Sequence, residues 1–245
     1  MFKRLPRYPE NAACKRLTNQ QINSFLKLKT MGFLAGGPFF HLTGKVGNNV
    51  GRRVKNKNVF SMRPGKSSKR ATKEQVDHRT GFGLMMKHVS LFSEAIALGF
   101  KNNKEDVAPG NAALTYNLKH GLKGTGPNYS INHEKFSISR GRLAPVQKPK
   151  VESVAGETAT LDFSWTVNYS FIMVNDTDLV KVYIYTPEVD QIVINSVITL
   201  RSALKLKMVV PFDFIGLPLH CYMMLVTADG KTVSNSQYCG SVTLT

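Results

Sequence analysis

Positive charge is concentrated at one end of this sequence. Residues 1–72 contain 16 Lys and Arg but a single acidic residue, Glu10. Residues 73–150 hold 12 basic and six acidic residues, and residues 151–245 hold five and nine. A block of like charge repels itself and resists compaction unless an anionic partner neutralises it. The sequence therefore predicts a cationic front that contacts a polyanion and a near-neutral back that folds tightly.

Nucleic acid is the commonest polyanion for such a segment, because each neutralised phosphate releases condensed counterions. Phe60 is a candidate for base stacking, with a core position as the alternative. A solvated basic arm that aids solubility, or that docks on an acidic protein surface, also fits the charge pattern. The candidate nucleic-acid-binding residues are the cations of a glycine-rich stretch and of the loop after it: Lys45, Arg52, Arg53, Lys55, Lys57, Arg63, Lys66, Lys69 and Arg70.

The whole chain has the composition of a soluble globular protein of one or two domains, with 245 residues of which 42% are hydrophobic and 20% charged. No stretch reaches the roughly 18 apolar residues of a membrane-spanning helix. Pro6, Pro9 and Glu10 interrupt the place where the apolar region of a signal peptide would begin. We expect a cytoplasmic location, or a virion or particle if the protein is of phage origin.

Three segments are expected along the chain. Residues 1–30 are predicted to form a basic arm with a short helix, for which Thr18 is a suitable N-cap. Residues 31–142 are predicted to combine a glycine-rich basic segment with a helical hairpin. Gly44, Gly47 and Gly51 fit neither a phosphate-binding loop nor a dinucleotide fingerprint, so they indicate a hairpin or a close-packed loop.

The helical hairpin is predicted from one capping signal and two apolar patterns. Thr72 and Gln75 have the spacing of a capping box. One long helix to Gly99 and a second helix from about Asn111 to Gly121 would bury their apolar stripes against each other and a neighbour. The stripe of the first helix consists of Phe82, Met85, Val89, Phe92 and Ile96.

The back of the chain is predicted to be all β, which makes the fold class α+β. Alternation predicts a strand at 135–141, and two prolines predict a linker at 143–149. About seven strands follow in 151–245, the size of an immunoglobulin- or fibronectin-like sandwich, with Trp165 in its core. The continuous apolar run 219–226 predicts a central strand, and Asp229-Gly230 predicts a two-residue hairpin turn.

No motif for catalysis or metal binding is present. Cys14, Cys221 and Cys239 lack ligand spacing and are expected to be free, buried thiols. The six histidines are expected at surface or packing positions, with His220 as a hydrogen-bonded core residue. The acidic residues after residue 175, such as Asp178, are expected to lie in turns and to bond their own backbone. We therefore expect no enzyme, no catalytic residue, no metal site, no cofactor and no small-molecule substrate.

An ordered set of short motifs runs from about Met31 to the carboxyl terminus: Gly44-Lys45-Val46-Gly47-Asn48, Pro127-x-Tyr129-Ser130-Ile131, Ile138-Ser139-Arg140-Gly141 and Ala228-Asp229-Gly230-Lys231. In order and spacing this set resembles an uncharacterised "domain of unknown function" family of small basic proteins from Bacteroidota. The resemblance implies a helical front and a sandwich back. It carries no assigned activity, so it transfers no catalytic residue.

Two functions are compatible with these features. The first is a non-enzymatic structural or interaction protein whose basic amino-terminal half contacts a polyanion and whose sandwich contacts a protein partner or another copy. The alternative is an assembly component of a phage, virion-like or surface particle, in which the basic arm makes subunit contacts. The alternative follows from a looser likeness to small structural proteins of phages and prophages.

Overall fold

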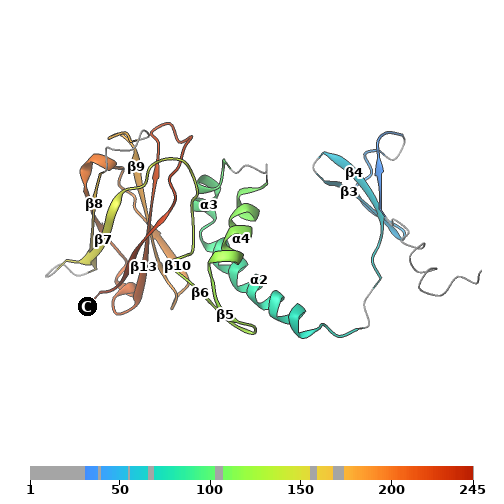
Figure 1. Cartoon of the computed structure of the whole chain (residues 1–245), viewed down its shortest axis with the longest axis horizontal. Helices are drawn as coiled ribbons and strands as arrows, with labels where there is room; N and C mark the ends of the chain where they lie inside the picture. The colour runs from blue at the N-terminus through green and yellow to red at the C-terminus, as the bar shows by residue number, and fades with distance from the viewer. Residues whose placement is uncertain are drawn as a thin grey trace, which may run out of the picture. The chain divides into compact units, whose positions relative to one another are not determined.

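The structure of the chain, a computed structural model, describes residues 31–37, 40–54, 56–65, 69–102, 107–154, 159–167 and 174–244. It divides into two compact units, Met1–Arg70 and Ala71–Thr245 (Figure 1). The α+β fold class with antiparallel sheets is confirmed. The helix expected within residues 1–30, and the candidate cations Lys55 and Lys66, lie outside the described residues.

The described part of the amino-terminal unit is an antiparallel sheet. Its strands lie in the order β1-β4-β3-β2, with β1 at Met31–Leu34, β2 at Gly44–Val46, β3 at Asn49–Val54 and β4 at Lys57–Met62. Gly47 adopts a positive φ of 57° in the turn between β2 and β3. A Cβ at Gly51 would clash with the carbonyl oxygen of Leu42. The glycines thus serve a hairpin and a close backbone approach, as predicted.

The carboxyl-terminal unit begins with three helices in the described chain: α2 (Lys73–Leu91), α3 (Ser93–Gly99) and α4 (Pro109–His120). The capping box of Thr72 and Gln75 is confirmed, with both reciprocal hydrogen bonds present. The prediction of one long helix to Gly99 is wrong, because Phe92 leaves helical geometry (φ −89°, ψ 24°) and separates α2 from α3. Helix α4 ends at Gly121, as predicted.

Two sheets and a short hairpin follow the helices. The hairpin pairs β5 (Leu122–Thr125) with β6 (Asn128–Ile131). One sheet has the order β10-β9-β13-β14, with β11 also paired to β9, and the other has the order β12-β8-β7. The central position predicted for residues 219–226 is confirmed by β13. The remaining bounds are β7 (Gln147–Ser153), β8 (Thr160–Thr166), β9 (Leu179–Thr186), β10 (Gln191–Ile194), β11 (Thr199–Leu200), β12 (Lys205–Val209), β13 (Pro218–Val226), β14 (Gln237–Thr243) and the 3₁₀ turns Arg201–Ala203 and Phe212–Phe214.

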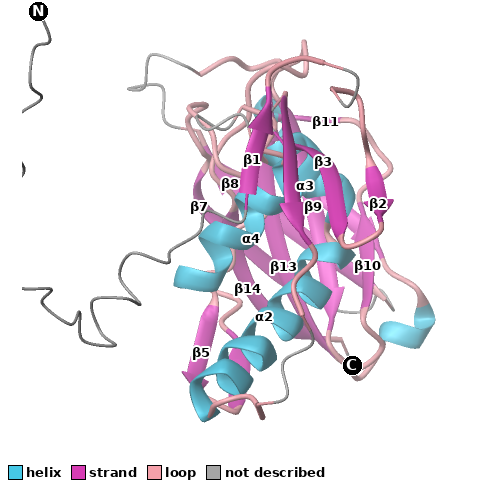
Figure 2. Ribbon diagram, turned by 90° about the vertical axis from the view of Figure 1, so that its right-hand side faces the viewer, coloured by secondary structure: helices cyan, strands magenta, loops and turns pink. Residues whose placement is uncertain are grey.

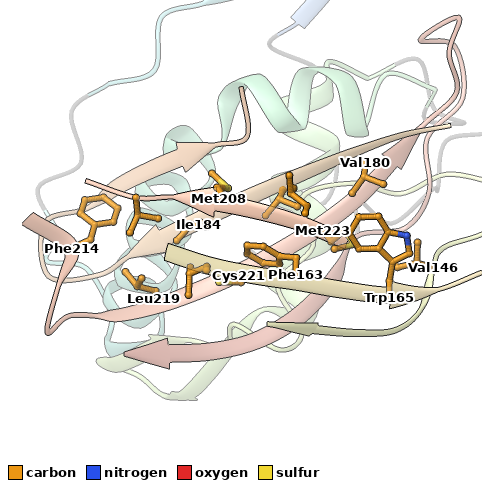
Figure 3. Packing of buried hydrophobic residues seen from close by; sticks show 14 of the residues in the cluster. Val146, Phe163, Trp165, Val180, Ile184, Met208, Phe214, Leu219, Cys221 and Met223 are labelled. Carbon is orange, nitrogen blue, oxygen red and sulfur yellow. The ribbon is translucent and has the colours of Figure 1, made fainter. Parts of the chain in front are cut away.

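The helices and the two sheets form three layers with two apolar cores (Figures 1 and 2). The inner core lies between the sheets and contains Trp165, as predicted, together with Phe163 (Figure 3). The outer core lies between the five-stranded sheet and the helices, where Phe92 contacts Tyr222. Phe82 was predicted in the helix stripe but is 41% exposed. From the sequence, this sheet was expected to pack only against the second sheet. In the structure, the helices also cover its outer face.

The strand predicted at residues 135–141 is wrong. Ser137 exchanges two hydrogen bonds of 2.8 Å with the Asn117 side chain, and the Ile138 N–H donates to Ser236 Oγ at 3.0 Å. Arg140 N–H donates to the Gly99 carbonyl at 3.0 Å. The backbone of this segment is therefore satisfied by side chains and helix ends instead of by a strand ladder.

The linker predicted at residues 143–149 is also wrong. Leu143 and Val146 are both 2% exposed and belong to the inner core. Strand β7 already begins at Gln147 and carries Pro149. Proline is tolerated there because β7 is the edge strand of its sheet and its register shifts between Gln147 and Lys150.

The two-residue turn predicted at Asp229-Gly230 is wrong as well. In the loop from Thr227 to Thr232 only Gly230 has a positive φ, at 68°. The Gly230 N–H donates to the Thr227 carbonyl at 2.8 Å, and Asp229 accepts hydrogen bonds from Thr227 Oγ1 and Lys231 N–H. The Asp229 side chain stabilises this longer turn, so the expectation that a turn aspartate bonds nearby backbone holds at this position.

Candidate functional site

The candidate cations of the amino-terminal unit are distributed over three strands and the segment after them. Lys45 lies on β2, Arg52 and Arg53 on β3, and Lys57 on β4, and all four are exposed. Beyond the sheet the exposed cations are Arg63, Lys69 and Arg70. The structure therefore brings four of the nine candidates together on one small sheet.

Strand register divides these four cations between the two faces of the sheet. Residues directly opposite each other in an antiparallel pair project to the same face. Val59 is opposite both Phe33 and Arg52. Lys57 is two residues before Val59 on the same strand, and Lys45 is opposite Val50, two residues before Arg52. We call the set Phe33, Lys45, Arg52 and Lys57 the cationic face.

Arg53 lies on the opposite face of the sheet. It shares that face with Gly51, on which the Leu42 backbone packs, and with Phe60, which lies opposite Gly51 and is half-buried. Phe60 was the aromatic residue considered for base stacking. The alternative considered for it, a packing position, agrees better with this partial burial.

Phe33 is the exposed aromatic residue of the cationic face, and sequence reasoning missed it. Its side chain is 68% exposed, although Lys57 Nζ lies 5.7 Å from the centroid of its ring. A cation over an aromatic face is a favourable electrostatic contact. In the sequence, Phe33 lies in the apolar run 31–34, which looks like a buried segment. Cross-strand register places its side chain on the same face as Arg52 and Lys57.

No carboxylate neutralises this face from within its own stretch of sequence, because residues 31–70 contain nine Lys and Arg and no Asp or Glu. In the part of the chain that the structure describes, no ion pair is formed by Lys45, Arg52, Arg53, Lys57, Arg63 or Arg70. The positive potential of the exposed surface is therefore available to an external anion.

A second cluster of polar aromatic residues lies between the helices and the five-stranded sheet. It joins His88 of α2, His133 after β6 and His220 of β13. The rings of His133 and His220 stack with centroids 3.7 Å apart, and His88 lies 5.6 Å from His133. His133 Nδ1 is 2.9 Å from Tyr222 Oη, and His220 Nδ1 is 2.8 Å from Tyr238 Oη.

Burial keeps this histidine cluster neutral. Desolvation lowers the pKa of His88 to about 3, with a further contribution from the neighbouring His133. Desolvation, and then the proximity of His220, lowers the pKa of His133 to about 4, and burial also lowers the pKa of His220. Burial raises the pKa of Tyr222 far above its ordinary value. These groups therefore keep one protonation state near neutral pH, and His133 and His220 act as hydrogen-bonded packing.

Asp190 links the same cluster to the surface. It accepts hydrogen bonds from Tyr185 Oη at 3.0 Å and from Lys87 Nζ. These two hydrogen bonds, that of Lys87 first, lower the pKa of the Asp190 carboxyl. Asp190 was expected to bond its own backbone, but it connects β9 to helix α2 instead. Within the described ranges no group of His, Cys, Asp and Glu is arranged to hold a metal ion.

Comparison with known protein families gives a match. The sequence profile of a family of unknown function (DUF6266) matches residues 41–240. The match covers 200 of the 245 residues. The chain belongs to this family. No curated protein matches it.

The DUF6266 match extends over both compact units. It takes in β2, β3 and β4 with their cations, all three helices, and the sheets as far as β14. Phe33 on β1 precedes the matched region.

The family region also contains a buried ion pair that sequence reasoning missed. Arg201 Nη2 lies 3.1 Å from Asp178 Oδ2, and both side chains are 1% exposed. Arg201 also donates to the Ala144 carbonyl at 2.7 Å, while its own carbonyl accepts from Trp165 Nε1 at 2.9 Å. Asp178 accepts from the Asn175 N–H at 3.2 Å, as expected for an aspartate at a turn, and it also forms the buried pair with Arg201.

The two described cysteines offer no reactive thiol. Cys221 and Cys239 are free, as expected, with Cys221 buried and Cys239 half-buried, and Cys14 lies outside the described residues. Desolvation raises the pKa of Cys239 to about 12 and that of Cys221 further still. Both remain protonated thiols at neutral pH. None of the described helices is long and apolar enough to cross a membrane.

Proposed function

We propose that the protein is a non-enzymatic structural or interaction protein whose basic amino-terminal unit binds a polyanion, with nucleic acid as the favoured class. The observation that carries this proposal is the acid-free charge of residues 31–70, which contain nine Lys and Arg and no Asp or Glu, and each of these cations that the structure describes is exposed. Such a surface attracts phosphates over distances near the Debye length, about 10 Å at 0.1 M salt.

Binding by counterion release has a measurable signature. The affinity of the full chain for labelled oligonucleotides, measured by fluorescence anisotropy, should fall steeply as salt rises, with a log–log slope of about −0.7 per neutralised phosphate for single strands. Replacing the described exposed cations of the unit with Gln should abolish most of the affinity: Lys45, Arg52, Arg53, Lys57, Arg63 and Arg70.

A charge-matched control separates this surface from net charge alone. Six exposed lysines of the other unit can be replaced with Gln in the same way: Lys101, Lys119, Lys123, Lys135, Lys150 and Lys205. This variant should retain affinity close to that of the unmodified chain. Absence of binding to DNA, RNA and heparin at about 20 mM salt would overturn the proposal, because electrostatic binding is strongest there.

The carboxyl-terminal unit is proposed to contact a protein partner or a second copy. The support is an exposed apolar patch around β11 and the residues before it, where Val197 is 64% and Ile198 80% exposed. This patch borders an open hollow of about 490 Å³ that also includes Leu200 and Leu206. Exposed apolar surface of this kind is typical of protein contacts.

The alternative, an assembly component of a phage, virion-like or surface particle, uses the same patch for subunit contacts. Light scattering of the purified chain distinguishes the two. A monomer that gains mass only on addition of nucleic acid favours the first function, whereas oligomers that dissociate in an Ile198→Asp variant favour the second.

We further propose that the two sheets form a sandwich of the immunoglobulin/fibronectin type. The support is their strand division, with β7, β8 and β12 in one sheet and β10, β9, β13 and β14 in the other. An experimental structure in which the mean strand directions cross at roughly 30° would agree with this assignment.

A further inference from the structure

We propose that the cationic face binds single-stranded nucleic acid, with Phe33 as a platform on which one base stacks. This inference rests on the proposed function and adds the class of ligand and the face that takes it. Its starting point is the juxtaposition of an exposed ring with three cations on one side of one sheet.

The spacing of the face fits an extended chain of phosphates. Strands in a sheet lie about 4.8 Å apart, so Phe33 and Arg52, which flank Val59 on either side, are separated by roughly 10 Å at the backbone. Val59 is 4% exposed and forms a covered floor between them. Strand β1 is at the edge of the sheet, so a base on Phe33 would have the cations on one side, with Lys57 nearest the ring and Arg52 across the floor.

The exposure of Phe33 is what distinguishes a base platform from a purely electrostatic surface. Apart from its contact with Lys57, the Phe33 ring is left in water, with 68% of the side chain exposed, so burying it would be favourable. Stacking with a base buries it, and every base offers the π-face that such contacts use. Phosphate contacts alone would need the three cations but not the ring.

A single strand suits this face better than a duplex. The bases of a duplex are stacked on one another and expose only their edges in the grooves. The cationic face is one side of a sheet, and its exposed ring lies at the edge of that side, next to Lys57. Proteins that bind single strands without sequence preference combine aromatic side chains, on which bases stack, with cations that contact the phosphate backbone.

The decisive experiment compares two neighbouring arginines in the full chain. Arg52 and Arg53 are adjacent, exposed and equally charged, but only Arg52 lies on the cationic face. With a labelled oligothymidylate in about 0.1 M salt, Arg52→Ala should weaken binding about fivefold, the effect of one lost phosphate contact. Arg53→Ala should change the affinity less than twofold.

The stacking contact has its own controls. Phe33→Ala should weaken oligothymidylate binding about tenfold with an unchanged salt slope, whereas Phe33→Tyr should retain it. Phe212→Ala removes an aromatic residue of similar exposure (73%) from the other unit and should have no effect. In a Phe33→Trp variant, oligothymidylate should quench the fluorescence of the new indole. The native Trp165 is 3% exposed and shielded from the ligand, so the change in fluorescence reports the new residue alone.

The outcomes separate the two proposals. Equal losses for Arg52→Ala and Arg53→Ala, together with no effect of Phe33→Ala, would overturn the single-strand site while leaving polyanion binding intact. Equal or tighter binding of a duplex, of heparin or of anionic vesicles would do the same. No binding of any polyanion would overturn the proposed function itself.

Discussion

The two compact units of this protein treat charge in opposite ways. In the carboxyl-terminal unit 17 Lys and Arg face 15 Asp and Glu. Several of these form pairs there: Arg201 with Asp178 inside the core, and Lys87 with Asp190 and Lys231 with Asp229 at the surface. Residues 31–70 of the amino-terminal unit contain nine cations and no acid.

This contrast separates charge that is paired within the fold from charge that we propose serves a partner. A buried carboxylate opposite an arginine fixes one arrangement of its neighbours, since neither group can be desolvated alone. Exposed cations with no internal partner add nothing to the fold and repel one another. The amino-terminal unit retains such cations on three adjacent strands, which is why we assign binding to that unit.

The largest effect is expected from breaking the buried pair. Asp178→Asn removes the counter-charge of Arg201 in a site where both side chains are 1% exposed. The free energy of unfolding should fall by about 3–5 kcal/mol. Urea unfolding followed by Trp165 fluorescence measures this loss, because Trp165 Nε1 donates to the Arg201 carbonyl.

Asp229→Asn provides the control for this substitution, because its ion pair with Lys231 is exposed. It should leave the urea midpoint almost unchanged. If the two variants changed the urea midpoint equally, the difference between buried and exposed charge in this comparison would be wrong.

The next largest effect is expected from acid. His88 is held neutral to about pH 3, whereas an unfolded histidine takes up its proton near pH 6.5. The unfolded state therefore binds more protons below pH 6.5, and stability should decrease as the pH falls through that value. We expect a loss of about 2–3 kcal/mol by pH 4 from His88. Urea unfolding at a series of pH values measures it.

Matched histidine variants test the source of this loss. His88→Phe should make the stability profile between pH 6.5 and pH 4 less steep, with the remaining slope from His133 and His220, whose pKa values are also lowered. His78→Gln, at an exposed position on the same helix, should not have this effect. Asp190 and Asp229, whose pKa values lie below 3.8, titrate under this range. A profile unchanged in His88→Phe would assign the acid sensitivity to other groups.

The smallest effect should be confined to the sheet of the amino-terminal unit. The Cβ of Gly51→Ala would clash with the Leu42 backbone, which has to shift. We expect a local cost of about 1–3 kcal/mol. Hydrogen exchange of the β3 and β4 amides should accelerate while the urea curve reported by Trp165 stays in place.

Gly65→Ala serves as the control, because no atom lies within 4 Å of the added Cβ. It should leave the exchange of β3 and β4 unchanged. A shift of the Trp165 transition in Gly51→Ala would show that the two units unfold as one.

The sequence predicted the features that depend on a few adjacent residues. The capping box of Thr72 and Gln75 needs only a four-residue spacing, and the stop at Gly121 needs one residue. The alternation in residues 160–165 and 180–185 requires nothing beyond the pleat of a strand. These elements were predicted because local geometry determines them.

Features that depend on distant partners were not predicted. Residues 135–141 alternate like a strand, but Asn117 and Ser236 supply their hydrogen bonds from far along the chain. The cover of helices over β9 was signalled only by Tyr183 and Tyr185, whose rings alternate with Val182 and Ile184 and so make both faces of the strand apolar.

The candidate site shows the same division. The cations could be located from the sequence, because counting charges requires no knowledge of the fold. The count could not show that Arg52 and Arg53 lie on opposite faces of the sheet, and it did not identify Phe33. Both depend on cross-strand register, which places Phe33 and Arg52 on either side of Val59. The histidine cluster depends on three elements meeting, and no spacing in the sequence records it.

Strand β13 belongs to both cores of the carboxyl-terminal unit. Cys221 and Met223 face the inner core, while Tyr222 and Met224 face the outer one. Loss of either neighbouring layer would expose one side of β13 to water and weaken the support for the other. The helices and the three-stranded sheet should therefore melt in one cooperative transition, and the β13 amides should be among the last in the protein to exchange with solvent.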